Sequence, residues 1–281
     1  MDEDRHVRKS NLFVDGRYRF GVTEQKILLT IISKIRIGDI EFTPYRVNWS
    51  QLKKVTKNVV NTASKLNDVC EKLKNKTITL ESGGVHHGFG FLSGWSYEPG
   101  KWVEFRIDPC MKSLLLDLLE DGRFTLYRLE CILSLGSAYS IRLYEILKSH
   151  QWKGTVEINL ESLKWSLGVP PGAKSMNRFD NFKAKILDKA QRDLALHTDI
   201  KFNYRKVVEC RRVVSVQFVI SENKKYQTTL ASHPVTRGKV KDGDTILFND
   251  KEYVVQGECI RLKDGVMPIG IINQFYKEGR I

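Results

Sequence analysis

The sequence lacks the features that mark a disulfide-stapled, membrane-spanning or metal-binding protein. It has only five cysteines, at positions 70, 110, 131, 210 and 259. No two lie close enough for a CxxC ligand pair, so neither a disulfide framework nor a zinc site is indicated. No apolar run approaches the roughly 18 residues that a membrane span requires. No apolar signal core follows the charged stretch MDEDRHVRKSN, so we expect a soluble, cytoplasmic protein.

Motifs for catalysis are also missing. No Gly-Lys-Ser/Thr occurs, which excludes a P-loop. The six histidines include no His-hydrophobic-His pair of the kind that binds metal in rolling-circle nickases. His86 and His87 are adjacent and would point to opposite faces of a strand. Acidic residues form no evident cluster for two-metal phosphodiester chemistry. We therefore expect no catalytic residue, no metal and no cofactor.

What the chain has in excess is positive charge. Its 281 residues carry 46 Lys+Arg against 33 Asp+Glu, a formal net charge of +13, which favours nucleic acid or an anionic membrane as partner. Residues 174–212 hold 11 basic side chains against 5 acidic ones, and residues 53–76 hold 7 against 2. Residues 228–281 are nearly balanced, 8 against 7. The pattern indicates two binding surfaces and a third module with another task.

The two basic segments belong to what we interpret as two copies of one unit. VNWSQLKKVTK (47–57) aligns without gaps on INLESLKWSLG (158–168). QKILLTIISKI (25–35) resembles YSIRLYEILKS (139–149) upstream, and SKLNDVCEKL (64–73) resembles AKILDKAQRDL (184–194) downstream. Three matches in the same order, more than 100 residues apart, favour a duplicated domain over a solenoid.

Each copy shows the same order of expected elements. A long helix (23–36; 138–150) precedes a short strand (45–49; 155–160), a short helix (50–57; 161–168) and a basic helix (60–75; 176–195). Closing strands follow, TITLES with KWVEFRID in the first copy and TDIKFNYRKV with RRVVSVQFVIS in the second. This is the order of a winged helix. The expected fold is α+β: two tandem winged-helix domains, 1–132 and 133–227, and a small C-terminal β-rich extension, 228–281.

The basic helix of the second copy has two neighbouring stripes. Phe179, Phe182, Ile186, Ala190 and Leu194 recur at the spacing of a buried face. The cationic stripe beside them would be an ordinary solvated surface in a random helix, but here the charge balance favours DNA. The expected DNA-binding residues are Lys174, Arg178, Asn181, Lys185, Lys189 and Arg192 on this helix, Arg205, Lys206, Arg211 and Arg212 around a hairpin tip, and Asn58, Asn61, Lys65 and Lys72 in the first copy.

The two hairpins invite different interpretations. The arginine-rich tip of the second wing suits phosphates, which supply affinity and register rather than sequence preference. An ordinary polar hairpin is the alternative. SGGVHHGFG (82–90) is expected to form the tip of the first wing.

Four of these segments carry a family resemblance. VRKSNLFVDGRYRFGVTEQKILLTIISKI (7–35) and LSLGSAYSIRLYEILK (133–148) resemble the signature helices of the plasmid replication initiator (Rep) family, the iteron-binding initiators of theta-replicating plasmids. INLESLKWSLG and FDNFKAKILDKAQRDLALHTDIKF continue the match, so it covers about 7–222.

The resemblance implies double-stranded DNA at a replication origin as the partner, read mostly by the second winged helix. It also implies a monomer that activates the origin and a dimer that represses its own gene. Strand opening and loading of host factors such as a helicase would follow. A transcriptional regulator on the same fold is the alternative function.

Two further segments each allow two interpretations. The linking stretch 109–135 is rich in leucine, and we expect a dimerisation surface there, formed by Leu114, Leu115, Leu118 and Leu119. A plain buried linking helix is the alternative. In the extension, TILFNDKEYVVQ predicts a β-hairpin with Asn249-Asp250 in its turn, and CIRLKDG could add a strand. The extension could contact a partner or pack as a structural addition.

Overall fold

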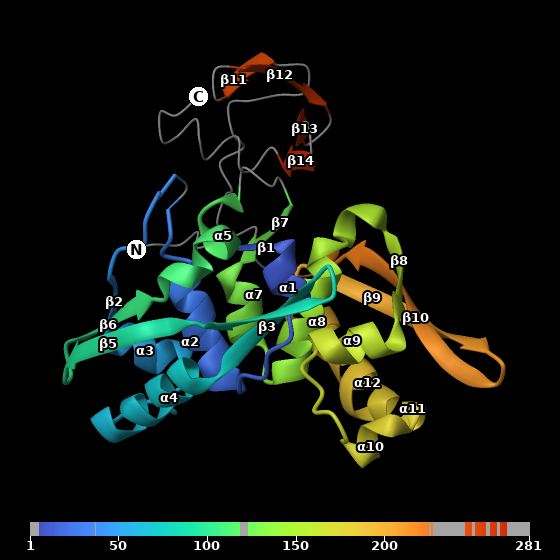
Figure 1. The fold of residues 1–281 in the computed structure, drawn as a ribbon, viewed down its shortest axis with the longest axis horizontal. Coiled ribbons are helices and arrows are strands. Elements are labelled where there is room, and N and C mark those ends of the chain that lie inside the picture. The colour runs from blue at the N-terminus through green and yellow to red at the C-terminus, as the bar shows by residue number, and fades with distance from the viewer. Residues whose placement is uncertain are drawn as a thin grey trace.

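The computed structural model describes residues 6–36, 38–118, 123–224 and 226, and the backbone of four further strands between 245 and 268. Figure 1 shows two lobes side by side, one built from the first part of the chain and one from the second. Each lobe combines helices with a small antiparallel sheet. The predicted α+β class with two winged-helix domains is confirmed.

The first lobe begins with β1 (His6–Ser10), α1 (Asn11–Asp15) and α2 (Val22–Ile32). Helix α2 is the centre of its core, because nine of its eleven residues are buried. The other elements are β2 (Tyr45–Asn48), α3 (Trp49–Val55), α4 (Ala63–Asn75), β3 (Thr77–Ser82), β4 (Val85–Gly90), β5 (Leu92–Glu98) and β6 (Trp102–Ile107). Helix α4 begins after Thr62, whose side chain accepts a hydrogen bond from the Lys65 amide.

A connecting region leads to the second lobe. It comprises η1 (Pro109–Met111), α5 (Lys112–Leu115), β7 (Phe124–Arg128) and α7 (Leu129–Ser134). Strand β7 pairs antiparallel with β1, so the chain folds back on its own beginning before it enters the second lobe.

The second lobe repeats the first in its topology. Its elements are α8 (Ala138–Ser149), η2 (Gln151–Lys153), β8 (Thr155–Asn159), α9 (Leu160–Ser166), α10 (Lys174–Asn177), α11 (Phe179–Phe182), the π-helical turn η3 (Lys183–Leu187), α12 (Asp188–His197), β9 (Ile200–Glu209) and β10 (Arg212–Glu222). The sheets have the orders β2-β6-β5 and β8-β10-β9, so in both the last strand lies in the middle. This shared order supports the predicted duplication.

The expectation that SGGVHHGFG forms the tip of the first wing is wrong. Strand β3 (TITLES) pairs with β4 in a separate hairpin, while β6 (KWVEFRID) pairs with β5 and β2. Gly83 and Gly84 have positive φ angles of 59° and 79°, so they close a tight turn that returns the chain at once to β3. SGGVHHGFG therefore forms the turn and second strand of this additional hairpin, and the first wing turns between Glu98 and Trp102.

The extension contains a four-stranded antiparallel meander. Strands β11 (Thr245–Phe248) and β12 (Lys251–Gln256) form the predicted hairpin, and β13 (Cys259–Leu262) is the additional strand that CIRLKDG suggested. Strand β14 (Gly265–Pro268) completes the sheet. The predicted turn residues Asn249 and Asp250 lie outside the described residues.

The two lobes share one hydrophobic core and, within it, a buried polar network. Lys9 of β1 donates from Nζ to the Tyr18 hydroxyl at 2.8 Å and to Oε1 of Glu145 at 2.7 Å. Arg142 of α8 donates to Oε2 of Glu145 at 2.7 Å and reaches the carbonyl oxygens of Val14 and Gly16 in the first lobe. These bonds hold α8 against α1, which fixes the relative placement of the lobes.

In the part of the chain that the structure describes, no helix is both long and apolar enough to cross a membrane.

Candidate nucleic-acid interface

The basic region of the second lobe is anchored as its periodicity predicts. Phe182, Ile186, Ala190 and Leu194 are each at most 1% exposed, while Phe179 is partly buried. Asp188 fixes the same region to the wing, because it accepts hydrogen bonds from Lys183 at 2.8 Å and from the Tyr204 hydroxyl of β9. The exposed side of this rigid body carries Lys174, Lys185, Lys189 and Arg192, and Asn181 is half-buried.

A single helix from 176 to 195, as predicted, is not what forms. Arg178 has extended backbone angles, φ −80° and ψ 123°, so α10 ends before it and α11 begins after it. The carbonyl of Arg178 accepts hydrogen bonds from the amides of Asn181 and Phe182, which makes it the N-cap of α11. Arg178 is exposed at this corner rather than on one helical stripe with Lys185. The π-helical turn η3 adds a second irregularity, a feature often found at functional sites.

The wing of the second lobe is a long two-stranded hairpin. Cys210 and Arg211 have φ angles of 46° and 64°, as the tight hairpin turn between β9 and β10 requires. Arg211 and Arg212 lie at the exposed tip, as predicted. Arg205 and Lys206 do not: they pair with Gln217 and Val216 well along the ladder, because the turn falls after Glu209. Both are exposed, and Figure 1 shows the hairpin projecting from the lobe.

The first-lobe candidates divide between a turn and a helix. Asn58 has a φ of 62° in the turn after α3, and Asn61 lies just before the Thr62 cap, so neither is on α4. Lys65 and Lys72 are exposed and seven residues apart on α4, which places them on one face. The exposed residues of this helix also include Asp68 and Glu71, so its charge is more mixed than that of the second lobe.

The leucines proposed for dimerisation are buried in this conformation. Leu114, Leu115 and Leu118 are 3%, 2% and 5% exposed, and Leu119 lies outside the described residues. Helix α5 packs against β1, so this apolar surface is covered by the chain's own first lobe. Both interpretations of this segment expect burial in a monomer, so the dimerisation surface stays a prediction.

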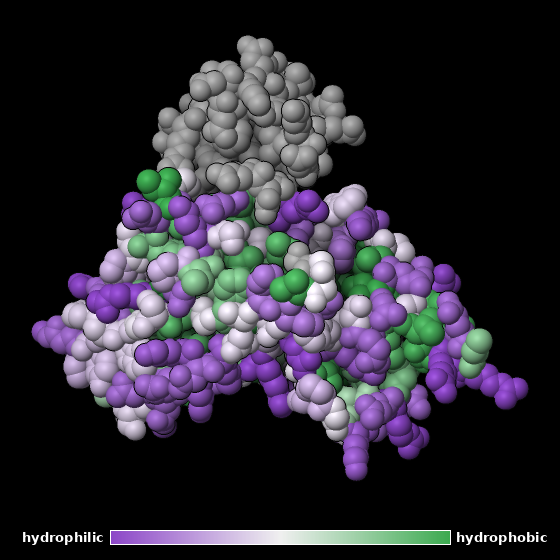
Figure 2. All heavy atoms as spheres, in the orientation of Figure 1, coloured by the Kyte–Doolittle hydropathy of each residue, from purple (hydrophilic) through white to green (hydrophobic). Residues whose placement is uncertain are grey.

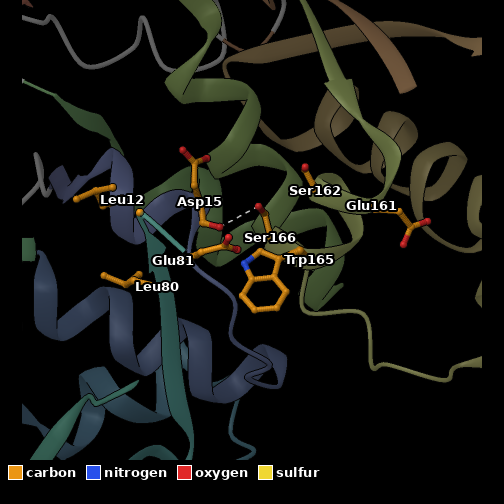
Figure 3. Close-up of a pocket in the computed structure, with 10 residues that line it drawn as sticks. Leu12, Asp15, Leu80, Glu81, Glu161, Ser162, Trp165 and Ser166 are labelled. Atoms are coloured by element: carbon orange, nitrogen blue, oxygen red, sulfur yellow. Dashed lines mark hydrogen bonds between the residues drawn. The ribbon is translucent and has the colours of Figure 1, made fainter. Parts of the chain in front are cut away.

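A groove of about 470 Å³ lies where the lobes meet. Figure 3 shows Asp15 of α1, Glu81 of β3, and Trp165 and Ser166 of α9 around it. The hydroxyl of Ser166 donates to the backbone oxygen of Asp15 at 2.9 Å. Burial raises the pKa of the Asp15 carboxyl, against the attraction of Arg142. The residues that line the groove include three carboxylates, those of Asp15, Glu81 and Glu161, and none of them is a histidine, lysine or arginine.

The polar network between the lobes was missed by sequence reasoning. Its signal is an arginine and a glutamate, Arg142 and Glu145, inside the apolar run of α8, with Lys9 in a buried strand. Charges at such positions are expected to be paired. The sequence does not show that Lys9 pairs with Glu145, because the two residues are 136 positions apart.

Comparisons with known proteins agree with this geometry. Residues 6–148 match the family profile described as Initiator Replication protein, WH1, and residues 159–220 match Initiator Rep protein, WH2. The solved structure of Pi initiator protein in complex with iteron DNA is similar, with a TM-score of 0.65 and 15% identity over 79% of this chain and 98% of that one.

Domains 2 and 3 of RctB align at a TM-score of 0.42 and 13% identity over 72% of this chain and 81% of that one, too weakly to support an argument. The comparison with curated proteins finds no match. The WH1 match alone covers more than half of the 281 residues, and the WH2 match follows in the same order. The chain therefore belongs to the replication initiator (Rep) protein family.

Proposed function

We propose that this protein binds iterons, repeated double-stranded DNA sites at a plasmid origin, and initiates replication there. Initiators of this family are DNA-binding proteins without catalytic activity. The observation that carries the proposal is the joining of two winged helices through one core and one buried network. Because the lobes cannot rotate freely, their two basic helices present a fixed spacing to DNA. The structurally similar Pi initiator is itself bound to iteron DNA.

In this proposal the second lobe supplies most of the sequence reading. The exposed side of α11, η3 and α12 enters the major groove, where Lys185 and Asn181 lie near base edges and Arg178 contacts the groove wall or a guanine. Arg211 and Arg212 at the wing tip bind phosphates, and α4 contacts a second groove face through Lys65 and Lys72. Several monomers on adjacent repeats would bend the origin, and their contacts offset the deformation energy.

Self-association and host partners belong to the same proposal. Release of the linking segment would expose Leu114, Leu115 and Leu118 and let two first domains pair. That dimer would repress the protein's own gene, while monomers at the origin recruit host replication factors such as a helicase. The proposed domain boundaries lie at 132 and 227, and the site of action is the cytoplasm, where plasmid DNA lies.

DNase footprinting on the element that encodes the chain tests the proposal. Protection of tandem direct repeats beside an AT-rich tract is the expected result. Protection of a single inverted repeat over a promoter would instead identify a transcriptional regulator. Uniform protection without any preferred sequence would contradict both functions.

A further inference from the structure

The loop between α1 and α2 is the place where both lobes are tied together. The backbone of Arg17 exchanges two hydrogen bonds of 2.8 Å with Thr79 of β3 in the first lobe. Its guanidinium lies 4.7 Å from the ring centroid of Trp165 and donates to the carbonyl of Val169, both in the second lobe. The loop is therefore held from two sides.

The residues that follow are fixed even more closely. Tyr18 and Phe20 are 3% and 1% exposed, and the Tyr18 hydroxyl accepts a hydrogen bond from Lys9. Gly168 packs so tightly on this loop that a Cβ there would lie 2.2 Å from the carbonyl oxygen of Tyr18. Arg19, between two buried aromatic residues, is exposed. A cation with a long side chain thus projects from a backbone that has little freedom.

Arg19 also lies between the two helices proposed to enter DNA. Lys76, which directly follows α4, has its ammonium 5.8 Å from the ring centroid of Phe20. On the other side, Gly168 and Val169 begin the turn that leads to α10. Figure 1 shows this loop between α4 and α9, on the side of the molecule away from the C-terminal strands. Figure 2 shows hydrophilic residues along the same edge of both lobes and in the recess between them.

The geometry of DNA indicates what a cation at this position could contact. Two major-groove faces on one side of a duplex are about one helical turn apart, roughly 34 Å, and the minor groove faces the protein between them. Arginine is the side chain that narrow, A·T-rich minor grooves attract most. We propose that Arg19 is a third DNA contact, inserted into the minor groove between the two recognition helices and selecting A·T pairs there. The inference rests on the proposed function.

The test uses the full chain and a duplex that it enriches from a random-sequence DNA pool, with a scrambled duplex for comparison. We expect R19A to bind the enriched duplex about tenfold more weakly. It should also lower the salt slope, the steepness with which the logarithm of the binding constant falls with the logarithm of the salt concentration, by about one. The matched control is R36A, because Arg36 is also exposed but lies beyond the other end of α2. R36A should leave both quantities unchanged. R19K should keep the salt slope, since it keeps the charge.

Base substitutions locate the contact. Replacing central A·T pairs by G·C puts an amino group into the minor groove and should weaken the wild type but not R19A. Replacing them by inosine·cytosine pairs changes the major-groove pattern but adds no amino group to the minor groove, so it should be tolerated. The inference is overturned if R19A binds like R36A, or if G·C weakens both proteins equally. If the wild type enriches no sequence at all, the proposed function itself is wrong.

Discussion

The ammonium of Lys9 and the carboxylate of Glu145 form a 2.7 Å ion pair in which both side chains are at most 1% exposed. Arg142 adds a second cation to the same carboxylate at 2.7 Å. Burial alone would raise the pKa of Glu145, but the two cations outweigh it and lower the pKa to about 2. One carboxylate thus neutralises charge from two segments far apart in the chain, and the join between the lobes depends on it.

Replacement of Glu145 by glutamine should destabilise the protein by about 3–5 kcal/mol, because Lys9 and Arg142 stay buried and lose the carboxylate that both of them contact. Urea unfolding followed by circular dichroism measures the change. The control is E161Q, since Glu161 is 78% exposed where it pairs with Lys164 and should contribute at most about 1 kcal/mol. Equal effects of the two substitutions would show that the network does not hold the lobes together.

Low pH should destabilise the protein through protonation of the Glu145 carboxylate. The pKa of Glu145 falls from 4.5 to about 2 on folding, so the unfolded chain binds the proton more readily. The stabilisation is present above pH 4.5 and is lost as the pH falls toward 2. Unfolding free energies should therefore fall more steeply across this window for the wild type than for E145Q. Parallel pH profiles would contradict this assignment.

Side chains that read bases should affect specific binding alone. R178A and K185A should each cost about 1–3 kcal/mol on the enriched duplex and relax the preference at one or two positions. K153A is the control, because Lys153 in η2 is exposed and outside the proposed interface. Titrations on enriched and scrambled duplexes decide the matter, and equal losses on both would argue against base contacts.

The wing tip should behave in the opposite way. R211A and R212A are expected to weaken binding to every sequence alike and to lower the salt slope by about one, because phosphates carry no sequence information. Binding measured at several salt concentrations on both duplexes checks this. A slope equal to that of the wild type would place these arginines away from phosphate.

A charge in the linking segment should shift self-association. In L118E the segment packs less well on the first lobe, so we expect the monomer–dimer ratio to change more than the affinity of the remaining monomer for the enriched duplex. Sedimentation beside a binding titration measures both quantities. The idea fails if the wild type stays monomeric at tens of micromolar, or if L118E simply unfolds.

Local patterns of the sequence were sufficient for the parts of this fold that depend on near neighbours. The spacing of Phe182, Ile186 and Leu194 predicts their burial, because a helical face is set by residues three and four positions apart. The order of helices and strands predicts the winged helices, because each helix or strand is recognised from residues that are close together in the sequence. Arg211 and Arg212 were also predicted at the tip of the wing, where Cys210 and Arg211 form the turn.

Tertiary structure alone decided the features that depend on distant partners. The pairing of β3 with β4 is an exception, because the two-residue turn Gly83-Gly84 is a local hairpin signal that sequence reasoning missed. The break at Arg178 falls just before the apolar stripe begins at Phe179, so the spacing of that stripe gives no signal for it. The pairing of Lys9 with Glu145 and the placement of Arg19 between two recognition helices arise only when lobes more than 100 residues apart pack together, since no local pattern encodes which buried charges will meet.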